Sequence, residues 1–279
     1  MNPAAQAEPL ISIVTPVKNG SAYLVDLIES VLAQDYRNFE HIIIDDGSDD
    51  GGATVAILQR YPHLRWWSRE NRGQYPTMNE GLEAARGDLI TCISADDRFV
   101  TPGAFRTVIA YCNAHPACDL VYGKTLQMDE AGTLFPYQTD ITARYSQWAL
   151  RHYLFVQHCS LFVRRGLIAD ERIVFDASLR YRGDWDWIIR LFKQARQIGY
   201  LPRPLSVFRV HRAQTTQSTS AQALTLETRE VLRRHGASYR THRLIRALVS
   251  YRAMSLIGLA TLRTQGASAL KARVVDWVR

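Results

Sequence analysis

The first hundred residues alternate between short apolar segments and segments with helical spacing. The apolar segments predict strands at 11–15, 39–44, 64–67 and 88–94, and the segments between them predict helices at 23–34, 53–60 and 75–86. Strands separated by helices are typical of a parallel sheet whose two faces are both covered. We therefore predict an α/β fold with a mostly parallel sheet and helices on both faces.

The pattern is less regular after residue 100. We expect a turn at Met128–Gly132, helices at 102–114 and 184–195, and strands at 119–122, 159–163 and 206–210. The polar stretch 212–220 has no periodicity and indicates a loop. We therefore place one domain at residues 1–215 and a basic, helical C-terminal extension at 216–279.

The basic charge is concentrated in this extension. The formal net charge is +7, but residues 229–279 hold eleven Lys or Arg against two acids, which gives +9 there and −2 elsewhere. The extension could be solvated helices packed on the domain, a nucleic-acid site, or a segment that docks on an anionic membrane surface. We favour the membrane surface because arginines flank an apolar helical stripe that includes Leu244, Leu248, Tyr251, Leu259 and Leu262. We expect no nucleic-acid partner, since no aromatic-rich or known binding motif is present.

Cysteine usage and the N-terminus predict a cytoplasmic protein. The four cysteines lie in apolar segments without CxxC spacing, which favours reduced core thiols over disulfides or a zinc site. The first nine residues lack the regions of a signal peptide, and no segment approaches the ~18 apolar residues of a membrane span. We expect a cytoplasmic location, peripheral at the inner face of the membrane if the extension docks there.

Acidic and polar residues follow several of the predicted strands. Asp96 and Asp97 end the apolar run that begins at Asp88, and Thr15 and Asp46 end two earlier strands. Ligands of open α/β sheets lie beyond the carboxyl ends of strands, so these residues predict one shared crevice. Buried carboxylates are costly without a partner, and oxygen ligands of this kind suit Mg²⁺ or Mn²⁺ holding a phosphate.

Four motifs in this order resemble the family 2 glycosyltransferases. They are Val14-Thr15-Pro16 with Asn19, Asp45-Asp46-Gly47-Ser48, Asn79-Glu80-Gly81, and Ser94-Ala95-Asp96-Asp97. The resemblance covers roughly residues 10–215 and implies the GT-A fold, a Rossmann-like α/β domain that transfers sugar from a nucleotide-sugar with inversion. The Gln-x-x-Arg-Trp motif and membrane spans of processive members are absent, which implies transfer of a single sugar.

The resemblance also implies roles for individual residues. Thr15 and Asp46 would contact the nucleobase, and Asp96 the ribose or the sugar. Asp97 and His211 would bind the Mn²⁺ or Mg²⁺ that bridges the diphosphate, with Arg209 near the same phosphates. The donor site would further include Pro16, Asn19, Gly73, Gln74 and Asn79.

The segment Arg180–Arg190 resembles the part of the family that carries the catalytic base. It implies Asp184 as the general base and Asp186 as the alternative. Two residues apart in a helix, they point about 200° apart, so at most one of them faces the acceptor. Helix capping is the structural alternative for Asp184. His158 and Trp185 are candidates for the acceptor pocket, with a core role as the alternative for each.

We therefore expect an inverting, metal-dependent glycosyltransferase. It would move one sugar from a nucleotide-sugar to a hydroxyl of a glycan or lipid-linked glycan in polysaccharide or cell-envelope biosynthesis. We favour a UDP-sugar over other donors. Two alternatives stay open: a catalytically silent sugar-nucleotide-binding protein of the same fold, and a sugar nucleotidyltransferase. The latter would normally carry a Gly-rich loop after the first strand, which residues 15–20 do not resemble.

Overall fold

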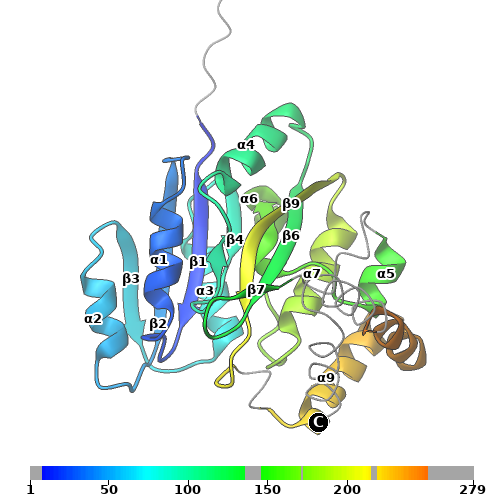
Figure 1. Cartoon of the computed structure of the whole chain (residues 1–279). Coiled ribbons are helices and arrows are strands. Elements are labelled where there is room, and N and C mark those ends of the chain that lie inside the picture. The colour runs from blue at the N-terminus through cyan, green and yellow to red at the C-terminus, as the bar shows by residue number, and fades with distance from the viewer. Residues whose placement is uncertain (1–7, 136–145, 171, 215–218, 251–279) are drawn as a thin grey trace, which may run out of the picture.

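The structure is a computed structural model that describes residues 8–135, 146–170, 172–214 and 219–250 (Figure 1). A nine-stranded sheet forms its centre, in the order β3-β2-β1-β4-β8-β6-β9-β5, with β7 paired to β6. The strands are β1 (Ile11–Val17), β2 (Phe39–Asp46), β3 (Leu64–Arg69), β4 (Leu89–Cys92), β5 (Arg98–Phe99), β6 (Leu120–Met128), β7 (Leu134–Phe135), β8 (Leu161–Arg164) and β9 (Ile198–Arg209).

Helices connect and cover these strands. They are α1 (Leu24–Leu32), α2 (Ala53–Gln59), α3 (Gln74–Ala84), α4 (Ala104–Ala114), α5 (Gln147–His152), the 3₁₀ turn η1 (His158–Ser160), α6 (Arg165–Asp170), α7 (Gly183–Gln194) and α9 (Ala221–Arg234). A further helical segment spans residues 239–250. The predicted α/β fold is confirmed, and each helix expected before residue 115 is present within a few residues of its predicted bounds.

The N-terminal half of the sheet is parallel. β1 pairs in parallel with β2 and β4, and β2 pairs in parallel with β3. The other half is mixed, because β8 runs antiparallel to both β4 and β6 whereas β9 runs parallel to β6. The carboxyl ends of β1, β2 and β4 therefore lie at one edge of the sheet, as the sequence predicts.

Prolines explain two differences from the predicted strands. β1 continues through Pro16 to Val17. The last residue pair between β1 and β4 is Val14 with Cys92, and the Val14 carbonyl accepts a hydrogen bond from the Ile93 N–H. The backbone of Pro16 faces the same side of β1 as that of Val14. Because the pairing with β4 has ended there, no strand requires an N–H group from Pro16. β9 begins eight residues before the predicted strand, because its register against β6 shifts around Lys124 and the bulge accommodates Pro202.

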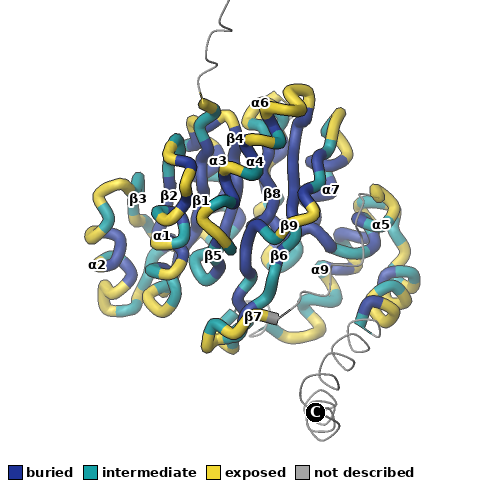
Figure 2. The backbone as a smooth tube through the Cα atoms, turned by 45° about the horizontal axis from the view of Figure 1, so that its top comes forward, coloured by how far each residue is buried: buried dark blue, intermediate teal, exposed yellow. Residues whose placement is uncertain are grey.

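Apolar side chains form a layer on each face of the sheet, and Figure 2 shows the central strands largely buried. Alternate residues of β1 serve different layers: Ile13 packs with α1 and α4, whereas Val14 packs with α3 and α7. The four cysteines are all buried and unpaired, as expected for core thiols.

The described part of the C-terminal segment packs into this same core. Val231 and Leu232 of α9 are buried in the cluster that contains Val14 and Trp187. The predicted boundary at residue 215 falls at the edge of 215–218, which lie outside the described residues. Residues 251–279, with much of the predicted apolar stripe, also lie outside them. Within the described residues, no helix is long and apolar enough to cross a membrane.

Candidate active site

A cavity of about 1290 Å³ opens at the carboxyl ends of the parallel strands. One half is lined by the ends of β1 and β2 and by the start of α3. The other half is lined by residues 153–158, by residues 180–185 at the start of α7, and by the helical segment 239–250. Figure 1 shows β1 and β2 toward one side of the molecule and α7 toward the other. We call the two halves of the cavity the β1–β2 half and the α7 half.

Asp46 joins two loops in the β1–β2 half. Its carboxylate forms an ion pair with Arg69 and accepts hydrogen bonds from the backbone N–H groups of Arg72 at 2.8 Å and Gly73 at 2.9 Å. Gly73 has φ +95°, a conformation that favours glycine, and α3 begins directly after it. Asp46, Gly73 and Gln74 all line the cavity.

Pro16 and Asn19 line the same half of the cavity. The Asn19 side chain is held by Asp49: its Nδ2 donates to the Asp49 carboxylate at 2.6 Å, and its Oδ1 accepts from the Asp49 N–H at 2.9 Å. Asn19 therefore fixes the β1 loop against the β2 loop.

Two residues that we expected at the donor site do not line the cavity. The Thr15 side chain is fully buried, and its hydroxyl lies 3.2 Å from Nε2 of His41. The Asn79 amide donates to the Phe175 carbonyl at 2.8 Å and accepts from the Phe175 N–H at 2.7 Å. Both side chains hold neighbouring elements together, so direct contact of either with a donor does not fit this geometry.

Asp96 and His211 face each other in the cavity wall. The His211 Nε2 lies 2.8 Å from Oδ2 of Asp96, and both residues line the cavity. Arg209 lies behind them: its Nε donates to the Asp96 carbonyl at 3.0 Å, and its guanidinium stacks 4.3 Å from the Tyr23 ring. Arg209 does not line the cavity, so it positions Asp96 instead of facing phosphates.

The role expected for Asp97 does not fit this geometry. Asp97 is fully buried and does not line the cavity. One of its oxygens accepts the Arg209 N–H at 3.0 Å. Burial, and then the charge of Asp96, raises the pKa of Asp97 well above its ordinary value. The structure thus favours Asp96 over Asp97 as the carboxylate available to a cation.

The Asp96–His211 pair offers one oxygen and one nitrogen ligand. Among the described residues, no group of three or more His, Cys, Asp or Glu could hold a metal ion. Mg²⁺ and Mn²⁺ sites that serve phosphates often use one or two carboxylates, with substrate oxygens and water as the remaining ligands. The pair therefore fits a cation that shares its shell with a diphosphate.

Asp184 faces the α7 half of the cavity. Its carboxylate accepts a hydrogen bond from the Tyr75 hydroxyl at 3.3 Å and lies 4.0 Å from Nδ1 of His158. α7 begins at Gly183 and shows no side-chain cap, so Asp184 is not engaged in capping. The carboxylate is thus available to a ligand in the cavity.

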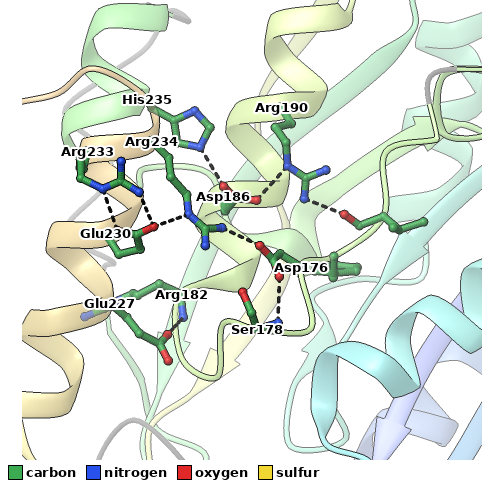
Figure 3. Close-up of polar contacts among 12 residues, drawn as sticks. Asp176, Ser178, Arg182, Asp186, Arg190, Glu227, Glu230, Arg233, Arg234 and His235 are labelled. Carbon is green, nitrogen blue, oxygen red and sulfur yellow. Dashed lines mark hydrogen bonds and ion pairs between the residues drawn. The ribbon is translucent and has the colours of Figure 1, made fainter.

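Asp186 points away from the cavity, as the helical spacing predicts for one of the two acids. It forms a buried ion pair with Arg190 at 2.8 Å and accepts from His235 at 2.9 Å (Figure 3). Burial raises its pKa, but the His235 hydrogen bond and the Arg190 charge outweigh burial, so the pKa lies below its ordinary value. Asp186 therefore does not fit as the alternative base.

His158 and Trp185 both reach the cavity wall from the core. His158 is 5% exposed, and its Nε2 lies 3.3 Å from the Ser94 hydroxyl. Burial lowers its pKa, against the opposing charge of Asp184. Trp185 is 2% exposed and donates to the Leu150 carbonyl at 2.7 Å, so most of its indole is core.

Two important contacts were not predicted from the sequence. Tyr75 lies beside the predicted donor loop, but only the fold brings it to Asp184. Glu227 of α9 accepts hydrogen bonds from the backbone N–H groups of Arg180 at 2.8 Å, Tyr181 at 2.7 Å and Arg182 at 3.0 Å. Figure 3 shows Glu227 beside Arg182. Glu227 thereby fixes the loop that precedes α7 and presents Asp184.

Comparison with known proteins identifies the family of the chain. Residues 12–170 match the family model described as glycosyl transferase family 2. An uncharacterized glycosyltransferase of Rickettsia typhi is 31% identical over 222 residues, which cover 77% of this chain and 68% of that protein. A PGL/p-HBAD biosynthesis glycosyltransferase of Mycobacterium tuberculosis is 29% identical over 194 residues, 67% of this chain and 71% of that protein.

Solved structures share the fold. S. aureus TarS 1-349 in complex with UDP-GlcNAc superposes with a TM-score of 0.66 at 19% identity, covering 77% of this chain and 64% of that one. The mannosyltransferase PcManGT of Pyrobaculum calidifontis, in complex with GDP-Man and Mn²⁺, gives 0.60 at 14% identity, covering 98% and 81%. The chain thus spans less than two thirds of the TarS fragment, and the predicted GT-A fold is confirmed. On the matched family model and these relatives, the chain is a glycosyltransferase that belongs to glycosyl transferase family 2.

Proposed function

We propose that this enzyme transfers one sugar, with inversion, from a nucleotide-sugar to an acceptor hydroxyl, with Asp184 as the general base. One observation carries the proposal: a single cavity is lined by Asp46 and Gly73, by the Asp96–His211 pair and by Asp184. An inverting transfer needs a nucleotide site, a charged centre beside the leaving diphosphate and a base facing the acceptor. The cavity offers residues for all three.

The residues have distinct tasks in this reaction. Asp46 has a lone pair left on the oxygen that accepts from Gly73, which suits an imide N–H of a uracil ring. Asp184 takes the proton of the acceptor hydroxyl while the acceptor oxygen bonds to the anomeric carbon. The bond from that carbon to the diphosphate breaks, and the nucleoside diphosphate leaves with the electron pair.

Asp96 and His211 would hold a divalent cation, Mn²⁺ or Mg²⁺, at the diphosphate. Such a cation neutralises charge that develops on the leaving group. Arg209 keeps Asp96 in place through the backbone carbonyl, and the Tyr23 ring lies 5.0 Å from the His211 ring. These contacts hold both ligands before substrate binds.

The names of relatives and structural neighbours support the class of donor and the kind of pathway that we propose. TarS was solved with UDP-GlcNAc, and PcManGT with GDP-Man and Mn²⁺, so neighbours of this fold bind nucleotide-sugars. We favour a UDP-sugar on the Asp46 geometry. The mycobacterial relative is named for PGL/p-HBAD biosynthesis, which supports a glycan or lipid-linked glycan acceptor in cell-envelope biosynthesis. Membrane docking through the C-terminal extension and a peripheral cytoplasmic location stay predictions.

The proposal is tested by screening nucleotide-sugars as donors, with wild type and with the variant Asp184→Asn. We expect one nucleotide-sugar to be hydrolysed or transferred by wild type with Mn²⁺ present. Asp184→Asn should bind the same nucleotide with unchanged affinity but turn over about 10²–10⁴-fold more slowly. Asp129→Asn, in the β6–β7 turn and outside the cavity lining, is the matched control and should retain activity.

Three outcomes would contradict the proposal. Wild-type binding without turnover of any donor would favour the catalytically silent sugar-nucleotide-binding protein. Release of pyrophosphate from a nucleoside triphosphate and a sugar phosphate would favour the nucleotidyltransferase. Full activity in Asp184→Asn would place the base elsewhere.

A further inference from the structure

Three arginines line the α7 half of the cavity. They are Arg180 and Arg182, from the loop before α7, and Arg246, from the helical segment 239–250. The proposed reaction uses none of them, because the proposed base is Asp184 and the proposed cation ligands are Asp96 and His211. Guanidinium groups that face a substrate cavity without a catalytic task indicate recognition of an anion.

None of these arginines forms an ion pair with a carboxylate of the described residues. The Arg182 Nε donates to the Thr228 hydroxyl at 3.3 Å, and the Arg180 guanidinium lies 5.7 Å from the Tyr181 ring. Arg246 has neither a hydrogen bond nor an ion pair within the described part of the chain. Glu227 bonds the backbone of this loop, not the guanidiniums (Figure 3). The positive charges of these three guanidinium groups are therefore available to an anionic ligand in the cavity.

Other arginines of the C-terminal segment are already engaged. Arg233 and Arg234 both contact Glu230, and Arg234 also contacts Asp176. The Arg229 guanidinium lies 4.6 Å from the Tyr239 ring. Arg246 differs from these three because it faces the cavity and has no such partner.

Arg182 and Arg246 act on the same neighbour. His242 lies in the same stretch of wall, its ring 5.6 Å from the Trp185 ring. Burial lowers the pKa of His242, and the charges of Arg246 and Arg182 lower it further, against a hydrogen bond with the His152 carbonyl. Arg182 and Arg246, from separate elements, thus line the same cavity wall as His242, in the half that Asp184 faces.

We propose that the α7 half of the cavity binds a phosphate group carried by the acceptor, and that Arg182 and Arg246 hold it. This inference rests on the proposed function, because it identifies the acceptor side by Asp184. A phosphate with several oxygens and two charges matches guanidiniums from two elements better than a single carboxylate does. The phosphate could belong to a lipid carrier or to a soluble phosphorylated glycan, since the two share this chemistry.

The test uses the full chain saturated with UDP and Mn²⁺, so that the donor site is filled. Glycerol 1-phosphate and decyl phosphate in detergent micelles are titrated as soluble and lipid-like probes, with acetate as the carboxylate comparison. We expect at least one phosphate probe to bind. Arg182→Gln and Arg246→Gln should each weaken that binding about tenfold. Arg243→Gln is the matched control, because Arg243 is exposed on the same helical segment and does not line the cavity.

UDP affinity of the unsaturated protein separates the two proposals. Failure of the wild-type protein to bind UDP would contradict the proposed donor. UDP binding without binding of either phosphate probe would overturn the proposed acceptor phosphate site and leave the proposed donor standing. Equal effects of Arg243→Gln and Arg246→Gln, or acetate binding as tight as phosphate binding, would also overturn it. Because Arg246 is exposed, its variant tests the site without disturbing a buried contact. Preference for decyl phosphate would assign the phosphate to a lipid carrier.

Discussion

The hydroxyl of Tyr75 lies 3.3 Å from the carboxylate of Asp184, although 109 residues separate them in the chain. Tyr75 is the second residue of α3, next to the loop held by Asp46, and its ring stacks on Phe175 with centroids 5.5 Å apart. Burial, and then the charge of Asp184, raises its pKa well above the ordinary value, so the phenol stays a donor. The proposed donor loop thus contacts the proposed base directly.

Tyr75→Phe should lower kcat about tenfold while nucleotide affinity stays close to wild type. The reason is the lost hydrogen bond to a charged carboxylate, whose typical contribution corresponds to about that factor. Steady-state turnover and nucleotide titration measure the two quantities. Tyr61→Phe removes a comparable hydrogen bond to Glu29 far from the cavity and serves as the control. Equal turnover of both variants would contradict a role for Tyr75 in positioning Asp184.

Asp96→Asn and Asp97→Asn should have different effects on metal dependence. We expect Asp96→Asn to weaken Mn²⁺-dependent nucleotide binding at least about tenfold, because Asp96 faces the cavity beside His211. Asp97→Asn should change it less than about threefold, since Asp97 is buried and turned to the Arg209 backbone. Nucleotide titrations over a range of Mn²⁺ concentrations measure both. The reverse order of effects would restore Asp97 as the cation ligand.

Asp186→Asn should destabilise the fold without removing catalysis. The substitution leaves Arg190 and His235 without their buried carboxylate, and breaking a buried ion pair costs about 3 kcal/mol. Urea unfolding measures the loss, and turnover per folded molecule should stay near wild type. A stable but inactive variant would show that Asp186 participates in the reaction.

Glu227→Ala should reduce both stability and kcat, although Glu227 lies outside the cavity lining. It removes the acceptor of three backbone N–H groups in the loop before Asp184, which we expect to cost about 2 kcal/mol. Urea unfolding and turnover measure these effects. Glu230→Ala, one turn further along α9 and bonded to exposed arginines, is the control and should retain wild-type turnover. Loss of turnover in both variants would indicate general loosening of α9.

Stability should fall as the pH drops below about 6.5, through His41. Burial, and then the charge of His63, lowers the pKa of His41 from 6.5 to about 3. Above pH 6.5 the His41 imidazole is neutral in both the folded and the unfolded state. Between pH 6.5 and about 3, His41 binds a proton only in the unfolded state. His41 therefore contributes a slope of up to about 1.4 kcal/mol per pH unit in that window. Urea unfolding from pH 7 to pH 4 should show a shallower slope in His41→Gln, and an unchanged slope would contradict this assignment.

The local patterns predicted the parallel half of the sheet, because each strand and helix there has its own periodic signal. The mixed half was harder to predict. Lys124 and Gln127 break the apolar pattern of β6, and the two prolines of β9 argue against a strand until the register shift is known. Strand pairing over long sequence separations fixed these elements, and a single sequence does not display it.

The motifs predicted which acids matter but not the direction in which each one points. β4 ends at Cys92, and Asp96 lies in the turn before β5, where it meets the cavity while Asp97 meets the Arg209 backbone. Helical spacing did separate Asp184 from Asp186, because the angle per residue is known in advance. The contacts of Tyr75 and Glu227 depend on how α3 and α9 pack on α7, for which the local sequence has no signal.

The contact between Glu227 and the loop before α7 has a consequence for synthesis of the chain. The strands and loops of the β1–β2 half all precede residue 100, whereas the residue that fixes the loop of Asp184 is made more than a hundred residues later. The residues of the proposed nucleotide site are therefore synthesised before the residue that holds the loop of the proposed base. This loop gains its three hydrogen bonds only after α9 has been made and has packed on α7.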